Sequence, residues 1–168
     1  MSSLPPAFLA SNGRDPAWLA ALPALIERLT ARWSLTLGPI FPNVELNYVA
    51  AATRADGRPA VLKVSRYIED TANEIAALRL WDGRGAARLL EADPALGALL
   101  IERVEPGGML VEVAEQDDDR ATVLTAGLLA RLWRPVAGPE LAGLRPLARW
   151  CAAYDRNRDA LARGQGGF

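Results

Sequence analysis

A single lysine interrupts the apolar run Ala60-Val61-Leu62-Lys63-Val64, which is otherwise typical of a buried β-strand. Removing an ammonium group from water costs several kcal/mol unless an opposite charge pairs with it. A fold that buries this strand therefore needs a carboxylate close to Lys63. Glu74 follows on a segment with helical character, and we expect it to supply that carboxylate.

The segments around Lys63 predict a mainly antiparallel sheet of five strands with one inserted helix. Apolar runs bounded by Gly, Pro and Asp are typical of strands. They occupy residues 33–37, 46–54, 59–64, 87–92 and 98–102. Gly38-Pro39 is expected to end the first strand, and Asp56-Gly57 is a hairpin-turn signal. The inserted helix is expected over residues 69–81, with a glycine of residues 82–85 as its left-handed cap.

The segments on either side of the sheet are predicted to be helices. A helix over residues 17–32 follows the capping residue Asp15 and Pro16. The acidic run over residues 117–119 suits the start of another helix, with a stripe of apolar residues, Ala121, Leu124, Leu128, Leu129, Leu132 and Trp133. A last helix is expected over about residues 146–161, with the inner face Leu147, Trp150, Cys151, Tyr154 and Leu161.

Strands followed by helices predict the α+β class. We divide the chain into three parts: a loose N-terminal arm over residues 1–14, a lobe with the sheet and its first helix over residues 15–107, and a helical part over residues 108–168.

Composition limits the possible chemistry. The chain has no histidine, which excludes Ser/His and Cys/His catalysis and the commonest metal ligand. The net charge of −1 produces no general electrostatic attraction to nucleic acid or to an anionic membrane. We find no secretory signal and no apolar run of ~18 residues, and the lone Cys151 favours a reducing compartment. We therefore expect a cytoplasmic protein with no nucleic-acid or membrane partner.

A strand lysine, a helix glutamate and a buried strand that runs into a turn occur in that order in the ATP-holding half of a kinase. The chain also resembles the aminoglycoside phosphotransferases of the streptomycin 6-kinase type, a family that includes hydroxyurea-resistance kinases. The resemblance covers about residues 17–161. The segments that carry it are residues 33–38, 47–50, 56–57, 61–64, 80–83, 86–93, 99–103 and 128–133.

This resemblance implies an ATP site. Lys63 would contact the α- and β-phosphates, and Glu74 would hold it in place through an ion pair. In the full-length relatives, Mg accompanies ATP and the phosphate acceptor is an aminoglycoside or another small alcohol. These are the partners that the resemblance implies.

The resemblance also implies how adenine would be held. The backbone carbonyl of Glu102 would accept a hydrogen bond from the adenine amino group, and the backbone amide of Val104 would donate one to the ring. Ile101 would occupy the gatekeeper position, and Val49 and Val61 would cover the faces of the ring.

The chain departs from the family pattern in two respects. The first hairpin has Gly38 but no Gly-x-Gly-x-x-Gly motif, and Pro39 has no amide hydrogen to donate. The family's His-Gly-Asp catalytic loop and metal-binding aspartate are not found, and residues 155–159 lie in a helical pattern with the wrong spacing. We therefore expect a truncated family member that has no catalytic or metal-binding residue and is inactive alone.

Other interpretations stay open at this point. Lys63 could be an edge-strand lysine that prevents aggregation, with Glu74 facing solvent. The chain could also be a non-catalytic kinase-like remnant or interaction module, whose exposed helical apolar surface promotes self-association. A generic α+β domain without nucleotide is a third interpretation.

Overall fold

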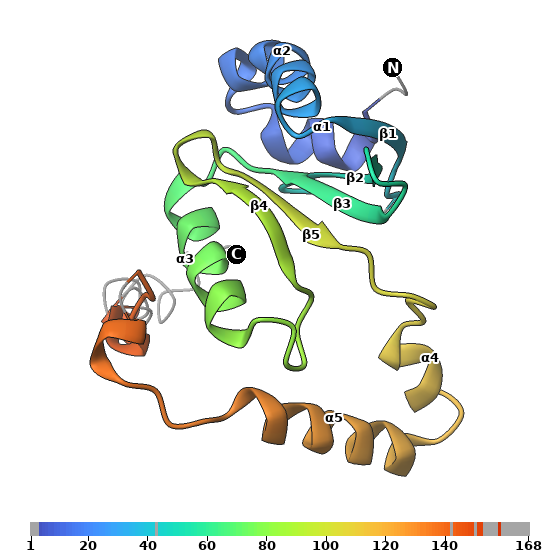
Figure 1. The fold of residues 1–168 in the computed structure, drawn as a ribbon, viewed down its shortest axis with the longest axis vertical. Coiled ribbons are helices and arrows are strands. Elements are labelled where there is room, and N and C mark those ends of the chain that lie inside the picture. The colour runs from blue at the N-terminus through green and yellow to red at the C-terminus, as the bar shows by residue number, and fades with distance from the viewer. Residues whose placement is uncertain (1–3, 43, 142, 150, 153–157, 159–168) are drawn as a thin grey trace.

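The fold is an α+β arrangement in which a five-stranded antiparallel sheet is followed by helices, as the sequence predicts (Figure 1). This computed structural model describes residues 4–42, 44–141, 143–149, 151–152 and 158. The strands lie in the spatial order β1-β2-β3-β5-β4, so β3 is at the centre, as is consistent with a kinase-like N-terminal lobe. They are β1 (Leu35–Ile40), β2 (Tyr48–Arg54), β3 (Pro59–Val64), β4 (Leu89–Asp93) and β5 (Ala98–Glu102).

Successive side chains of the central strand β3 point to opposite faces of the sheet. Ala60, Leu62 and Val64 are fully buried on one face, which we call the core face. Val61 and Lys63 are partly buried on the other, which we call the Lys63 face.

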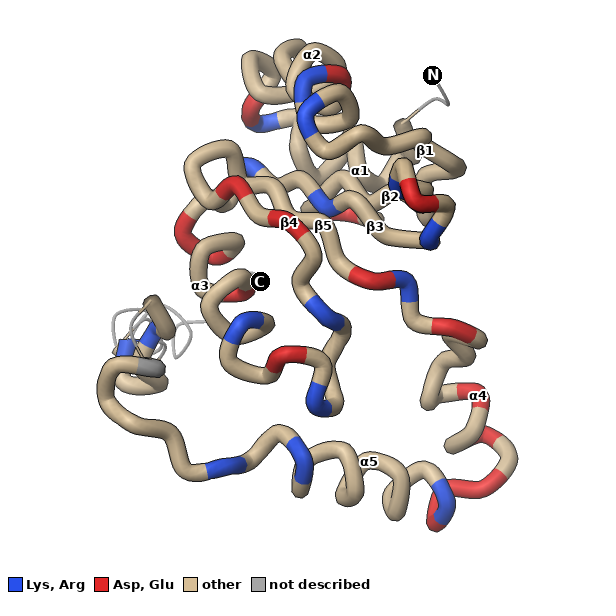
Figure 2. Tube along the Cα trace, viewed as in Figure 1, with Lys and Arg blue, Asp and Glu red and all other residues tan. Residues whose placement is uncertain are grey.

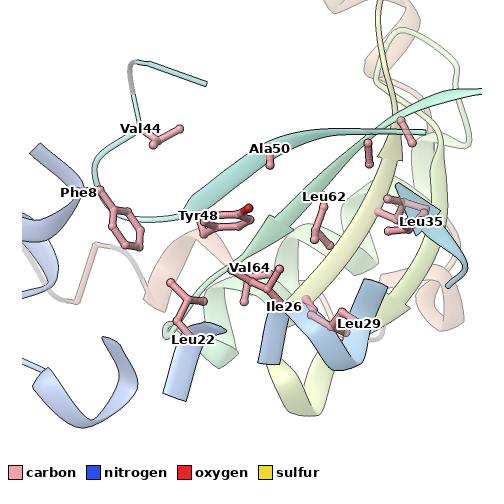
Figure 3. Close-up of a cluster of buried hydrophobic side chains, with 14 residues drawn as sticks. Phe8, Leu22, Ile26, Leu29, Leu35, Val44, Tyr48, Ala50, Leu62 and Val64 are labelled. Atoms are coloured by element: carbon pink, nitrogen blue, oxygen red, sulfur yellow. The ribbon is translucent and has the colours of Figure 1, made fainter. Parts of the chain in front are cut away.

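Different helices cover the two faces. On the core face, α1 (Pro6–Asn12) and α2 (Pro16–Arg32) pack into the main hydrophobic cluster (Figure 3). The Asp15 carboxylate caps α2 by accepting a hydrogen bond from the Trp18 amide at 3.0 Å, as predicted. On the Lys63 face, α3 (Ile68–Trp81) contributes Ile75 and Leu78 to a second cluster around Leu99.

The N-terminal residues differ from the loose arm expected over residues 1–14. Residues 6–12 form α1, and the Phe8 side chain is fully buried in the main cluster. The buried Asn12 amide donates hydrogen bonds to the carbonyls of Phe8 and Glu45, at 3.0 and 2.9 Å. The burial of Phe8 and the hydrogen bonds of Asn12 attach α1 to the sheet. The Pro, Ser and Gly content of this segment predicts neither the burial nor the hydrogen bonds.

The predicted end of the first strand is wrong. β1 continues through Gly38 and Pro39, with a register shift between Leu37 and Ile40 against β2. Because β1 is an edge strand, a proline that cannot donate a hydrogen bond is tolerated there.

The residue that caps α3 in the left-handed conformation is Asp82, with φ of 47°, and not a glycine as predicted. The Asp82 amide donates to the Leu78 carbonyl, and Gly83 follows with φ of 75°. Aspartate is among the few residues that adopt this conformation readily.

Beyond the sheet, the chain forms α4 (Leu110–Ala114), which falls in a segment with no predicted helix, and α5 (Asp118–Leu132). Asp117 caps α5 as expected and accepts a hydrogen bond from the Arg120 amide at 2.9 Å. Four residues of the predicted apolar stripe, Leu124, Leu128, Leu129 and Trp133, are exposed. Self-association through this surface stays a prediction.

The last helix is described in part. Residues 147–149 and 151–152 are helical. Leu147 is 75% exposed and Cys151 is also exposed, so neither belongs to the inner face that the sequence pattern predicts. Trp150, Tyr154 and Leu161 lie outside the described residues. Within the described chain, every helix is too short or too polar to cross a bilayer.

Candidate nucleotide-binding site

Lys63 and Glu74 form a bidentate ion pair on the Lys63 face. The Lys63 ammonium donates to both carboxylate oxygens of Glu74, at 2.8 and 2.7 Å from Nζ. The side chains are 22% and 35% exposed, respectively, so each retains limited access to water. The predicted pairing is confirmed, and Lys63 lies on the central strand and not at an edge.

The backbone around the pair fixes both partners. Lys63 lies between Val49 of β2 and Leu99 of β5 in the ladder. Glu74 belongs to α3, whose first turn is tied to β3 by a short connection: the Tyr67 amide donates to Ser65 Oγ at 3.0 Å. Rigid elements therefore present the ammonium and the carboxylate to each other.

Three of the predicted ring-contact residues share a face with Lys63. Val49 pairs with Lys63 across β2 and β3, and Val61 pairs with Ile101 across β3 and β5. Residues directly opposite in antiparallel strands point to the same face. Val49, Val61 and Ile101 are all partly buried, so they form an apolar patch next to a cation.

The two predicted adenine-contact residues lie where β5 ends. The Glu102 amide donates to the Arg88 carbonyl at 2.9 Å, and the Glu102 carboxylate accepts from the Arg88 amide at 2.8 Å. The Glu102 side chain therefore ties β5 to the start of β4. Val104 is 62% exposed, and among the described residues its amide donates to no other backbone carbonyl.

A cavity of about 1020 Å³ lies elsewhere, between α2 and β1. Ile26, Leu35 and Tyr48 of its lining belong to the main cluster of the core face. Burial raises the pKa of the Tyr48 hydroxyl above its ordinary value. The cavity therefore lies on the opposite side of the sheet from the ion pair. We place the candidate nucleotide site at the Lys63–Glu74 pair and not in this cavity.

The described residues assemble no group of three or more carboxylate or thiol side chains that could hold a metal ion. We therefore assign no metal ligand within that part of the chain.

Comparison with known proteins identifies relatives of the chain. Residues 32–166 match the family described as aminoglycoside/hydroxyurea antibiotic resistance kinase. A streptomycin 6-kinase from Streptomyces glaucescens is 44% identical over 131 residues, which are 78% of this chain and 41% of the relative. A hydroxyurea phosphotransferase from Kitasatospora aureofaciens is 41% identical over 141 residues, 83% of this chain and 40% of the relative.

A second streptomycin 6-kinase, from Streptomyces griseus, is 38% identical over 142 residues, or 84% of this chain and 46% of the relative. The chain thus spans less than half the length of the curated relatives that it matches.

Proposed function

The chain belongs to the aminoglycoside/hydroxyurea antibiotic resistance kinase family, and we propose that its Lys63 face binds the ATP from which a phosphoryl group is transferred. The observation that carries this proposal is the bidentate Lys63–Glu74 ion pair on the central strand. In kinases, a strand lysine held by a helix glutamate contacts the phosphates of ATP. Binding of ATP agrees with the cytoplasmic location that the sequence predicts, and we include that location in the proposal.

We assign the adenine ring to the apolar patch beside the ion pair. Val49 and Val61 would cover the ring, Ile101 would lie at its edge, and the backbone of Glu102 and Val104 would hydrogen-bond it. Val104 is exposed and its amide donates to no backbone carbonyl among the described residues, and the three apolar residues share one face; both observations support this assignment.

For the protein to which these residues belong, we propose transfer of the γ-phosphate of ATP, with Mg, to a hydroxyl of a streptomycin-type aminoglycoside or another small alcohol. The relatives named streptomycin 6-kinase support that acceptor, and the relative named hydroxyurea phosphotransferase supports a second one. These 168 residues contain no histidine and thus no His-Gly-Asp motif, so we assign them nucleotide binding and no catalytic residue.

A non-catalytic interaction module is the second candidate. Exposed apolar residues on α5 and at its C-terminal cap favour it, such as Leu124 at 49% and Trp133 at 78% exposure. A chain that binds no ATP but elutes as an oligomer in size-exclusion chromatography would support this alternative.

The sole lysine of the chain makes a direct test possible. An acyl-phosphate derivative of ATP acylates a lysine that lies beside the bound phosphates. We expect it to modify Lys63 faster than a nucleotide-free acyl phosphate does, and excess MgATP should slow the modification. Peptide mapping separates Lys63 from the N-terminal amine. Equal rates with the two reagents, unaffected by MgATP, would refute the ATP site.

A further inference from the structure

A segment far along the chain lies against the helix that carries Glu74. We call residues 143–149 the brace; it is part of the orange segment beside α3 in Figure 1. The Arg145 amide donates to the Asn73 side-chain oxygen at 2.6 Å. The Arg145 guanidinium Nη2 lies 2.7 Å from an Asp70 carboxylate oxygen and 3.7 Å from one of Glu69.

Burial separates a strong contact from a weak one in the brace. The Arg145 side chain is 15% exposed and its partner Asp70 is 56% exposed, whereas Arg149 and its partner Glu69, 3.0 Å apart, are 64% and 74% exposed. Exposed ion pairs contribute little, because water and salt screen them. Arg145 is therefore the main electrostatic contact between the brace and α3, and Arg149 serves as its matched control.

Two further contacts extend this attachment along α3. Gly143 has φ of +86° and is so close to Ala76 that a Cβ on it would lie 3.3 Å from the Ala76 Cβ. Near the other end of the helix, Arg134 Nη2 donates to the Leu80 carbonyl at 3.1 Å. The contacts therefore lie before and after Glu74 in the sequence of α3.

Most of these contacts lie on one side of the helix. At 3.6 residues per turn, positions 69, 73, 76 and 80 share one side of α3. Asp70, which Arg145 contacts most closely, lies about 90° round the helix from that side, towards Glu74. The buried positions Thr71, Ile75 and Leu78 lie on roughly the opposite side. Thus α3 is held between the sheet and the chain that follows α5, and Glu74 projects from between these two sides.

We propose that Arg145 is a positioning residue: its guanidinium, through Asp70, fixes α3 so that the Glu74 carboxylate reaches Lys63. The Arg145 amide contact to Asn73 is a backbone contact, and side-chain substitutions leave it in place. This inference rests on the proposed function for its effect on ATP, but its effect on the ion pair does not need a nucleotide. A bidentate contact at 2.7–2.8 Å tolerates little movement of the helix. Loosening the brace therefore weakens the pair and the phosphate site together.

The primary test measures the coupling between Lys63 and Glu74 by a double-mutant cycle, Lys63→Met with Glu74→Gln, in urea unfolding. The cycle is repeated in the Arg145→Gln and Arg149→Gln backgrounds. We expect Arg145→Gln to lower the coupling by about half or more, and Arg149→Gln to leave it unchanged. Arg145→Lys should restore most of it, because a single nitrogen of Arg145 makes both carboxylate contacts.

The secondary test measures MgATP binding by calorimetry. Arg145→Gln is expected to raise the Kd at least about threefold, within the twofold to thirtyfold span that couplings of about 0.5–2 kcal/mol correspond to. An unchanged coupling in the Arg145→Gln background overturns the proposal, even if overall stability falls. A lower coupling with an unchanged Kd also overturns it, because the brace would then be structural only.

If the wild-type chain binds no MgATP, the proposed function fails, and the coupling measurement alone decides whether Arg145 positions Glu74. If Arg145→Gln does not fold, Asp70→Asn takes its place in the same cycle, with Arg145→Lys as the variant that should keep most of the coupling. Wild-type coupling in the Asp70→Asn background would then overturn the proposal.

Discussion

The Lys63–Glu74 pair should make the two residues strongly coupled in stability, whether or not nucleotide is present. At 2.8 Å, two unit charges attract by about 1.5 kcal/mol in water and about 6 kcal/mol at the effective dielectric constant of a protein surface. Desolvation and the ordering of two long side chains offset most of the larger figure. Because Lys63 is only 22% exposed and the contact is bidentate, we expect a coupling energy of about 1–2 kcal/mol.

The assay is the double-mutant cycle of Lys63→Met and Glu74→Gln, with unfolding free energies from urea titration at neutral pH. Glu74→Gln should cost more than Lys63→Met, because it leaves the less exposed partner, the ammonium, without its counter-charge. The Arg54–Asp56 pair, at 3.6 Å with exposures of 31% and 46%, is the matched control and should couple by less than about 0.5 kcal/mol. If the losses of unfolding free energy from Lys63→Met and Glu74→Gln were simply additive in the double variant, the reasoning would be refuted.

Three further predictions test the fold. Phe8→Ala should lower the unfolding free energy by about 3–5 kcal/mol in urea titration, because the ring is fully buried; a loss below about 1 kcal/mol would restore the loose-arm interpretation. Gly97→Ala should destabilise far more than Gly57→Ala: both glycines have positive φ, but a Cβ at Gly97 collides with the Ser65 carbonyl oxygen, whereas Gly57 faces open space. We expect about 1–2 kcal/mol at Gly57, and equal losses in thermal unfolding would contradict the collision. Because burial raises the pKa of Tyr48, its contribution to stability is complete below about pH 10 and is lost as the pH rises further; Tyr48→Phe should flatten the decline of the unfolding free energy above about pH 10, and parallel curves would exclude it.

Much of the sheet and of the charged pair could be predicted from local sequence. The bounds of β3 and β5 agree with the predicted residues 59–64 and 98–102, because each run has a clear apolar pattern between turn residues. The ion pair could be predicted because a lysine in a buried strand needs a carboxylate, and Glu74 lies on the next helix. The nucleotide contacts of these residues stay predictions.

The errors occur where distant contacts override composition. The composition of residues 6–12 predicts a loose arm. In the structure, Phe8 packs in the core and the Asn12 side chain donates a hydrogen bond to the Glu45 carbonyl. Gly38 and Pro39 predict the end of the first strand, but β1 continues through them because it lies at the edge of the sheet. Neither outcome is encoded in neighbouring residues.

The sequence by itself determined that a lysine would be buried in a strand, that an acid on the following helix would neutralise it, and that further helices would follow the sheet. Only the tertiary structure decided which outer side of α3 is held, because Arg145 and Asn73 are 72 positions apart and no local pattern links them. Hydrophobic periodicity and turn residues act over a few positions, whereas an ion pair between distant segments depends on where the completed fold brings their charges together.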